Sequence, residues 1–565
     1  MNPGKPSVLQ RVVLFLVAML ISVFPSSIGG KFWWAFGVQE VHAADDDDDN
    51  GGDGDGDGDG DGDGDGDGDG DGDGDGDGDG DGDTGSAPWV PLRTVAPLVP
   101  STADLARQGF VRIINHSLTS GSVRVIGIDD DGNRHRGGTL RLESGEAAHF
   151  NSDDLESGND RKALAGGTGS GQGDWHLELL TDLDIEVLSY VRGEDGFLTS
   201  MHDVVPGTGT RHWVAVFNPA SNLEQQSLLR LINPGEQEAA VTITGIDDAG
   251  NSPGSPVQVR IAGGAALLLT ASELEEGAGL EGALGDGRGK WRLIVDSSQP
   301  IGVMNLLGSA SGHLANLSTV PVNEKDGVYR VPLFPAASDE YGRQGFVRVI
   351  NRSGDAGEFR ITAFDDTDRA YDPLTMALGA NEAVHFNSDD LELGNEAKGL
   401  TGSTGPGTGD WYLEITGGLD MEVLSFVRHP DRFLTAMHDL APKVGTGHFV
   451  AIFNPASNEN QLSKLRLVNP GDADAAVTII GTDDRGERSK GQVEVSVPGR
   501  GTRTLTARQL ESGAGVEGEL GDRSGKWRLF VESDRPIQVM SLLESPTRHL
   551  TNLSTARGDA DLAIE

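Results

Sequence analysis

The stretch Val111-Arg112-Ile113-Ile114-Asn115 decides the fold, because it recurs three times along the chain with only small apolar exchanges. Each recurrence lies 118 residues after the previous one, and the arginine is present every time. The later forms are Leu229-Arg230-Leu231-Ile232-Asn233, Val347-Arg348-Val349-Ile350-Asn351 and Leu465-Arg466-Leu467-Val468-Asn469. A fixed period of this length predicts four copies of one structural unit.

Further features recur in step with this stretch. Each copy has a pair of aspartates, a Leu-Glu dipeptide and a tryptophan that follows a Gly-rich loop. The aspartate pairs are Asp129-Asp130, Asp247-Asp248, Asp365-Asp366 and Asp483-Asp484. The dipeptides are Leu155-Glu156, Leu274-Glu275, Leu391-Glu392 and Leu510-Glu511, and the tryptophans are Trp175, Trp291, Trp411 and Trp527.

The copies are of two kinds in alternation. Copies one and three share the sequence FNSDDLE and the tripeptide MHD, whereas copies two and four share FNPASN and the motif HLxNLST. Like copies are 236 residues apart, as His313 and His549 show. We therefore infer an ABAB arrangement that arose when a pair of copies was duplicated together.

Within each copy the local patterns are strand-like. In copy one, residues 110–114, 122–128, 175–179 and 185–191 are rich in Val, Ile and Leu, and Gly, Asn, Asp and Ser separate them. One short helix is expected near 152–156, with Asn151 or Ser152 as its cap and Gly158 as its stop. The same interpretation fits residues 270–274 of copy two.

These patterns predict an all-β chain of four tandem antiparallel β-sandwich modules with Ig-like character. We expect module A1 at 89–207, B1 at 208–322, A2 at 323–443 and B2 at 444–556, followed by a flexible tail at 557–565. In strand pattern, unit length and repetition, the chain loosely resembles the tandem immunoglobulin-like or fibronectin-like modules of secreted bacterial surface proteins. This resemblance implies a fold and no site residues, because the Cys…Trp…Cys signature of true immunoglobulin domains is absent.

The first 44 residues have the pattern of a signal peptide. Lys5 and Arg11 precede an apolar run of 13 residues at 12–24, which is short for a membrane span of about 20 residues. Val41-His42-Ala43 resembles a small-residue cleavage site. We expect export to the cell envelope or the extracellular space, with no membrane attachment after cleavage. An uncleaved membrane anchor is the alternative.

Residues 45–88 form an acidic linker. Five consecutive aspartates, Asp45 to Asp49, precede fifteen Asp-Gly repeats that run from Asp53 to Gly82. Glycine is conformationally permissive and neighbouring aspartates repel one another, so this tract is expected to be disordered and extended. It serves as a spacer in the main interpretation and as a diffuse binder of cations in the alternative.

Composition excludes several classes of function. The 44 Lys+Arg and 89 Asp+Glu give a net charge of −45, which is unsuited to nucleic-acid binding because phosphate contacts need Lys and Arg. The chain has no Cys, so it has no disulfide framework, thiol nucleophile or thiolate-bound metal.

The aspartate pairs are weak candidates for a metal site, and calcium is the cation that their oxygen ligands would suit. The candidate ligands are Asp129, Asp130, Asp247, Asp248, Asp365, Asp366, Asp483 and Asp484. Adjacent residues of a strand point to opposite faces, which is poor geometry for a catalytic pair. A turn or a structural ion pair is the favoured interpretation.

The repeated arginine lies in an apolar strand and therefore needs a carboxylate partner. We expect a structural ion pair in every copy, with Asp129 or Glu156 as the partner of Arg112. The tryptophans are expected in the core. His149 and His385 align with Leu268 and, in copy four, with Leu505 or a near neighbour, and His202 and His438 align with Ser318 and Ser554, so we interpret these histidines as packed residues.

The sequence thus predicts an exported, non-enzymatic repeat protein without a cofactor. Its role would be structural or adhesive, through multivalent contacts with a surface glycan or a protein ligand. Two alternatives remain: a secreted hydrolase or lyase that acts on polysaccharide, and a calcium-dependent carbohydrate-binding protein. An active site would require an asymmetric cleft with convergent carboxylates.

Overall fold

A computed structural model describes residues 92–202, 207–319, 327–438 and 443–555, one range for each copy. The predicted signal peptide, the Asp-Gly linker and the flexible tail lie outside the described residues. Every strand pair in the described ranges is antiparallel, and helices are few and short, so the prediction of an all-β chain is confirmed. The described residues, from Leu92 to Thr555, all belong to one compact unit.

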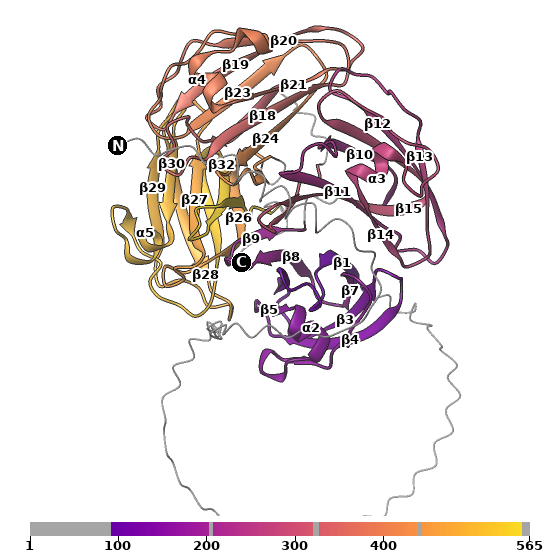
Figure 1. The fold of residues 1–565 in the computed structure, drawn as a ribbon. Helices are drawn as coiled ribbons and strands as arrows, with labels where there is room; N and C mark the ends of the chain where they lie inside the picture. Colours follow the sequence, from indigo (N-terminus) through magenta and orange to yellow (C-terminus); the bar gives the residue numbers. More distant parts are fainter. Residues whose placement is uncertain (1–91, 203–206, 320–326, 439–442, 556–565) are drawn as a thin grey trace, which may run out of the picture. The chain divides into compact units, whose positions relative to one another are not determined.

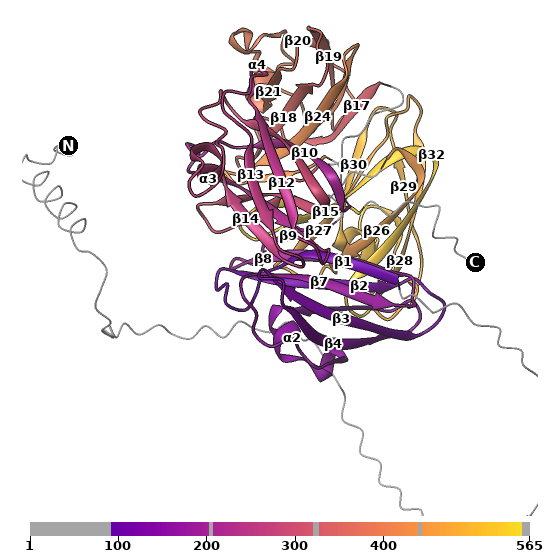
Figure 2. The same cartoon turned by 90° about the vertical axis from the view of Figure 1, so that its right-hand side faces the viewer.

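Copy one contains two antiparallel sheets, with strand orders β1-β7-β3-β4-β6 and β5-β2-β8-β9. The strands of the first sheet lie side by side in Figure 2. The elements are β1 (Leu92–Val99), β2 (Arg107–Asn115), β3 (Gly121–Asp129), β4 (Arg134–Leu142), β5 (Ala147–Asn151), α2 (Ser152–Ser157), η1 (Asp160–Lys162), β6 (Leu164–Ala165), β7 (Trp175–Thr181), β8 (Ile185–Gly193) and β9 (Leu198–Ser200).

Copy three repeats this arrangement, with sheets β17-β23-β19-β20-β22 and β21-β18-β24-β25 (Figure 1). Its elements are β17 (Val328–Phe334), β18 (Gln344–Asn351), β19 (Gly357–Asp365), β20 (Leu374–Leu378), β21 (Ala383–Asn387), α4 (Ser388–Leu393), η2 (Glu396–Lys398), β22 (Leu400–Thr401), β23 (Trp411–Gly417), β24 (Met421–Arg428) and β25 (Leu434–Ala436).

In copies two and four one long strand runs through both layers and joins them into a single sheet path. In copy two this strand is β15 (Trp291–Ser309), which pairs with β10 (Gly209–Phe217) and β12 (Ala239–Ile246) along its first half. Its second half pairs with β11 (Gln225–Ile232) and β16 (Leu314–Asn316). The other elements are β13 (Val257–Ile261), β14 (Ala266–Thr270) and α3 (Ala271–Glu276).

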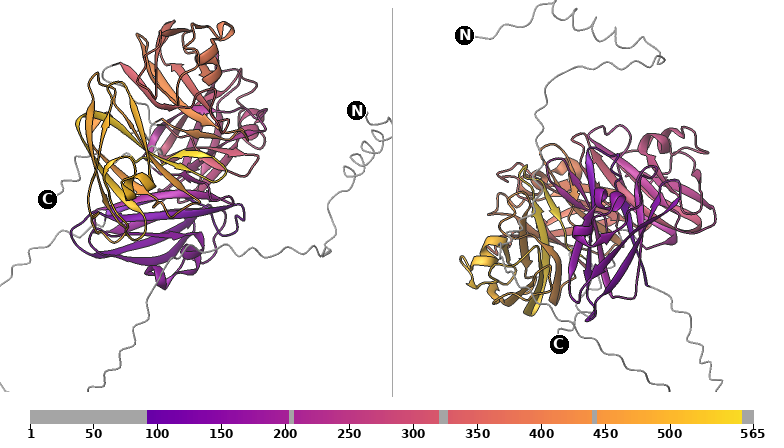
Figure 3. Two further views of the ribbon diagram at one scale, coloured as in Figure 1. Left: turned by 90° about the vertical axis from the view of Figure 1, so that its left-hand side faces the viewer. Right: turned by 90° about the horizontal axis from the view of Figure 1, so that it is seen from below.

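Copy four has the corresponding long strand, β32 (Trp527–Glu544), among the yellow strands of Figure 3. The remaining elements are β26 (Gly445–Phe453), β27 (Leu462–Val468), β28 (Ala475–Thr482), β29 (Val493–Val497), β30 (Thr502–Thr506), α5 (Ala507–Ser512), β31 (Glu517–Gly518) and β33 (Leu550–Asn552).

The predicted short helix is present in each copy. In copy one Asn151 caps α2, its side chain accepting a hydrogen bond from Asp154 N, and Gly158 follows the last turn. In copy two Thr270 caps α3 in the same way. Each helix satisfies its first free backbone N–H groups through a capping box, as expected where Asn or Thr stands three residues before Asp, Glu or Gln.

Each copy has its own hydrophobic core, which draws side chains from both layers. In copy one, Val111 and Ile113 of β2 meet Val123 and Val125 of β3, and Trp175 is fully buried among them. The other three cores contain Trp291, Trp411 and Trp527 in the same place. The prediction that these tryptophans belong to the core is confirmed.

Within the described residues, five further apolar clusters lie between copies, and four of them link the copies in a closed cycle. Representative residues are Met201 with Met304 for copies one and two, Leu317 with Phe426 for two and three, Met437 with Met540 for three and four, and Tyr190 with Leu543 for four and one. The strands β9, β16, β25 and β33 also contact one another in that order, and β33 contacts β9. Copy four therefore packs against copy one.

Among the residues that the structure describes, no helix is both long enough and apolar enough to cross a membrane.

Candidate functional site

The first aspartate of each pair fixes the turn that follows it. Asp129 accepts hydrogen bonds from Asn133 N at 2.8 Å and from Gln172 N at 3.1 Å. The second of these donors belongs to the Gly-rich loop before Trp175. Asp247 accepts corresponding bonds from Asn251 N and Arg288 N. Both oxygens of these carboxylates thus hold the backbone of two loops, which is the structural role that the turn interpretation predicted.

The second aspartate of each pair joins two copies. Its Oδ2 accepts a hydrogen bond from its own Gly-rich loop, while its Oδ1 faces the repeated arginine of the next copy. Asp130, for example, accepts from Asp174 N at 2.9 Å and lies 2.6 Å from Nη2 of Arg230. The other pairs are Asp248–Arg348 at 2.7 Å, Asp366–Arg466 at 2.9 Å and Asp484–Arg112 at 2.7 Å.

The expected ion pair of the arginine is therefore present four times, but the expected partner was wrong. Arg112 pairs neither with Asp129 nor with Glu156 of its own copy. Its partner is Asp484 of copy four, and the cycle of ion pairs closes there. The arginine side chains are almost completely buried, and the aspartates are partly exposed. A buried guanidinium needs a carboxylate, and packing between copies brings that carboxylate from a neighbour.

Hydrogen-bond alignment differs between the pairs. Arg230 and Arg466 donate hydrogen bonds to their aspartates, whereas Arg112 and Arg348 make ion-pair contacts outside hydrogen-bond alignment.

Burial opposes the charge of Asp484, but Arg112 and Lys526 outweigh it and lower the pKa of this carboxyl below its ordinary value. A backbone bond from Ala147 N to Asp484 O, 2.8 Å long, supports the same junction.

The Leu-Glu dipeptide supplies an acceptor for the core tryptophan. Trp175 Nε1 donates to Glu156 at 3.0 Å, and Trp291 Nε1 donates to Glu275 at 2.6 Å. The corresponding bonds in copies three and four are Trp411–Glu392 at 3.0 Å and Trp527–Glu511 at 2.8 Å. A buried indole N–H needs such a partner, so the repeated Glu is part of the scaffold.

Two groups of histidines behave as packed residues. Burial lowers the pKa of His149 to about 3 and that of His385 to about 4, so both rings are neutral at ordinary pH. His438 is buried next to Phe426 and contacts the backbone of Ser425. Ser554 Oγ accepts the equivalent backbone bond from Ser541 N in copy four.

A different set of polar residues meets at the loops before β9, β16, β25 and β33. In every copy the residue just before this strand closes a hairpin through its carbonyl oxygen: Phe197 accepts from Gly193 N, His313 from Ser309 N, Phe433 from His429 N and His549 from Ser545 N. The four positions are therefore equivalent, and the residue alternates between Phe and His. Because the four strands contact one another, the two histidines come together.

We call Asp195, His313, Asp431 and His549 the His–Asp cluster. The ring centroids of His313 and His549 are 4.5 Å apart, although the residues belong to copies two and four. Asp195 lies 3.2 Å from Nε2 of His313 and 3.8 Å from Nδ1 of His549. Asp431 lies 3.1 Å from Nε2 of His549 and 3.8 Å from Nδ1 of His313.

Hydroxyl and backbone groups hold the two carboxylates in place. Thr547 Oγ1 donates to Asp195 at 2.6 Å, and Ser311 Oγ donates to Asp431 at 2.8 Å. Each carboxylate also accepts a bond of 3.0 Å from a backbone N–H two residues later, that of Phe197 or Phe433. The aromatic rings of Phe197 and Phe433 pack against the histidines.

The electrostatics of the cluster follow from this geometry. Burial opposes a charge on His313, but hydrogen bonds and charge from Asp195 and Asp431 outweigh it and raise its pKa to about 9. Burial also opposes ionisation of the two carboxyls, yet their hydrogen bonds hold the pKa of Asp195 and the pKa of Asp431 well below the usual range. Both carboxylates are therefore charged at ordinary pH.

Sequence reasoning did not identify this cluster. It noted His313 and His549 only as members of the HLxNLST motif. One signal was available: Phe197-Leu198-Thr199 and Phe433-Leu434-Thr435 align with His313-Leu314-Ala315 and His549-Leu550-Thr551, so a polar residue replaces an apolar one at a buried position in every second copy. Their meeting depends on contacts between copies, which no single copy reveals.

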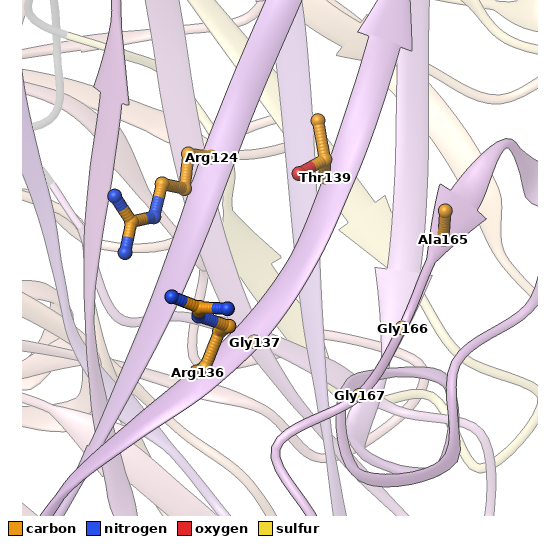
Figure 4. A pocket seen from close by; sticks show the side chains of 7 residues that line it. All are labelled: Arg124, Arg136, Gly137, Thr139, Ala165, Gly166 and Gly167. Carbon is orange, nitrogen blue, oxygen red and sulfur yellow. The ribbon is translucent and has the colours of Figure 1, made fainter.

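A shallow depression of about 390 Å³ lies on the first sheet of copy one (Figure 4). It is lined by Arg124, Arg136, Gly137, Thr139, Ala165, Gly166 and Gly167, and Figure 4 shows the two guanidinium groups next to each other. The lining contains two cations and no carboxylate, so it differs from the pair of carboxylates that glycoside hydrolysis requires.

No protein-family model matches the chain, and no curated protein matches its sequence. Among solved structures, a glycoside hydrolase of family 32 from Bifidobacterium adolescentis aligns with 81% of this chain and 100% of its own, at 8% identity and a TM-score of 0.12.

Proposed function

We propose that this chain is an exported, non-enzymatic repeat protein of the cell surface or the extracellular space, built of four Ig-like β-sandwich copies that act as a structural or ligand-binding scaffold. One observation carries the proposal: the charged residues that every copy repeats are engaged with one another and hold the copies together. Arg112 with Asp484 and Arg230 with Asp130 are examples.

Two further observations support it. Each copy consists of antiparallel layers around a core tryptophan, which is the construction of a β-sandwich. A single active site would make one copy differ from the others. Here the first aspartate of the pair accepts a hydrogen bond from the same loop in successive copies, as Asp129 and Asp247 do. The proposal that the chain is exported rests on the signal-peptide pattern of residues 1–44.

Four equivalent copies on one chain favour multivalent binding, since linked weak contacts raise avidity without any new contact. The partner class would be a surface glycan or a protein ligand. The depression with Arg124 and Arg136 offers two guanidinium groups to an anionic group of such a ligand. In copy three the residue that corresponds to Arg124 is also an arginine, Arg360.

The test is binding of the full-length protein to a glycan array and to whole bacterial cells, beside the double variant Arg124→Ala/Arg136→Ala. Saturable retention supports the proposal, and weaker retention of the variant on acidic glycans places the contact in copy one. Release of reducing sugar from a polysaccharide, at a rate that scales with protein concentration, would overturn it in favour of the hydrolase alternative.

Calcium binding by the aspartate pairs stays a prediction. Their oxygens already accept hydrogen bonds or face arginine, as Asp248 does with Lys290 N and Arg348. Thermal unfolding in chelator and in millimolar Ca²⁺ measures the effect: a higher Tm with Ca²⁺ supports the calcium-dependent alternative, and equal values remove it.

A further inference from the structure

We infer that His313, His549 and Asp195 bind a divalent transition-metal ion of the zinc class, with Asp431 as the carboxylate that orients His549. The site would lie where copies one, two, three and four contact one another through the loops before β9, β16, β25 and β33. It is independent of the proposed function, because a structural scaffold and an enzyme could both carry such an ion.

The donor atoms of the cluster are of the kinds that a zinc-class ion prefers. Imidazole nitrogen suits Zn²⁺, Cu²⁺, Ni²⁺ and Fe²⁺, whereas Ca²⁺ and Mg²⁺ take oxygen ligands almost exclusively. Two imidazoles and one carboxylate are also the three protein ligands of many zinc sites that keep a fourth position for water. Among the aspartate pairs, Asp129 has one imidazole beside it, with Nε2 of His135 3.2 Å from its Oδ2, but in the described part of the chain none of these pairs belongs to a group of three such donors.

The donor atoms also lie at separations that suit such an ion. One nitrogen of His313, one nitrogen of His549 and one oxygen of Asp195 all lie within 4.8 Å of one another. Zinc–nitrogen and zinc–oxygen bonds of about 2.0–2.2 Å place tetrahedral ligand atoms roughly 3.3–3.5 Å apart. Oδ1 of Asp195 lies 3.2 Å from Nε2 of His313 and its Oδ2 lies 3.8 Å from Nδ1 of His549, so the carboxylate approaches both rings at separations close to that value.

Neighbouring carboxylate and hydroxyl groups orient the ligand side chains. Metal-bound histidines usually donate their other ring N–H to a carboxylate or carbonyl. His549 has this arrangement: its Nδ1 faces Asp195, and its Nε2 lies 3.1 Å from the carboxylate of Asp431. Thr547 Oγ1 donates to Asp195 and leaves the second oxygen of that carboxylate near His313.

The packing around the cluster leaves the ligand side chains accessible to an ion. The histidine side chains are about one-tenth exposed, while Asp195 and Asp431 are 21% and 29% exposed, so an ion can enter past the carboxylates.

The ring of a third histidine, His429, lies 4.8 Å from that of His549. His429 is buried, and within the described part of the chain its Nδ1 has no hydrogen-bond partner. A third imidazole with an unused nitrogen thus borders the cluster.

The internal repeat supplies matched variants. His549→Phe installs the residue that copies one and three carry at the equivalent position, Phe197 and Phe433. The control, His385→Leu, removes a histidine elsewhere and installs the residue of the aligned position Leu268. Asp195→Asn keeps the shape of a ligand and removes its charge, and it serves if His549→Phe fails to fold.

The experiment is titration of full-length, chelator-treated protein with ZnCl₂, followed by calorimetry and by metal analysis after dialysis. We expect one ion per chain in the wild type and in His385→Leu. His549→Phe and Asp195→Asn should lose at least about tenfold in affinity, and Asp431→Asn about tenfold to a hundredfold. Co²⁺ in place of Zn²⁺ should give visible absorption typical of nitrogen and oxygen ligands.

Two results would overturn the inference. The first is a wild type that binds zinc no more tightly than His549→Phe, with circular dichroism showing that both are folded. The second is an equal loss in His385→Leu, which would mean that the ion binds to histidines at random. A change of Tm in Zn²⁺ that only the wild type and the control show supports the site.

Discussion

The guanidinium Nη2 of Arg112 lies 2.7 Å from Oδ1 of Asp484, which joins the first copy to the fourth. The Arg112 side chain is 2% exposed, so its charge has little contact with water. The same relationship links Arg230 to Asp130, Arg348 to Asp248 and Arg466 to Asp366. The repeated arginine and the second aspartate of the pair are thus two halves of one junction.

Replacement of Arg112 by Met should destabilise the chain, because it leaves the carboxylate of Asp484 without its cation in a partly buried place. We expect a loss of about 3 kcal/mol in the free energy of unfolding, measured by urea denaturation. The control is Arg260→Ala, which breaks an exposed pair with Glu238 and should cost at most about 0.5 kcal/mol. Equal losses in the two variants would contradict a special role for the junction.

Replacement of Gly289 by Ala should be more costly than the same change at Gly279. Both glycines have φ of +76°, so both substitutions place a side chain in the left-handed region at about 1 kcal/mol. At Gly289 the new Cβ would also lie 2.2 Å from Oδ2 of Asp248, whereas at Gly279 nothing lies within 4 Å. The difference in Tm between the two variants therefore measures how firmly the aspartate holds the Gly-rich loop. A similar Tm in both would show that this loop adjusts freely.

Replacement of Glu275 by Ala should leave two donors without an acceptor, Trp291 Nε1 and the backbone N–H of Ala220. The expected loss is about 2–3 kcal/mol, since an unsatisfied buried donor costs about 1–3 kcal/mol. Glu276→Ala alters the neighbouring exposed residue and should change the urea midpoint little. If Glu275→Ala unfolds at the same urea concentration as this control, the prediction is wrong, and water replaces the carboxylate with no loss in the free energy of unfolding.

Acid should destabilise the chain through its buried histidines, of which His438 is the clearest. Burial lowers the pKa of His438 to about 4 in the folded chain, from 6.5. Below pH 6.5 the unfolded chain therefore binds a proton that the folded chain does not, and stability falls by about 1.4 kcal/mol per pH unit from this group until pH 4.

The matched variant is His438→Ser, which installs the residue found at Ser318 and Ser554. Those serines accept the equivalent backbone hydrogen bond, from Asn305 N at 2.8 Å and Ser541 N at 2.9 Å. Between pH 6.5 and pH 4.5 the variant should lose about 2–3 kcal/mol less than the wild type, as urea unfolding at several pH values would show. Parallel pH profiles would mean that His438 already carries a proton in the folded chain.

Much of the local structure could be predicted from the sequence. Period and apolar patterning gave the four copies, the strands and the core position of the tryptophans, because these depend on neighbours within one copy. Asn151 and Gly158 marked the ends of a helix for the same local reason. The partner of Arg112 could not be predicted, because its own copy offers Asp129 and Glu156, and nothing local favours Asp484 over them.

The sequence by itself determined the number of copies, their ABAB order and the all-β character of the chain, since each follows from repetition and side-chain patterning along the backbone. Only the tertiary structure decided which aspartate neutralises each arginine and that copy four packs against copy one. It also decided that His313 and His549 meet beside Asp195. These are contacts between residues a hundred or more positions apart, and they arise from the way whole copies bury apolar surface against one another.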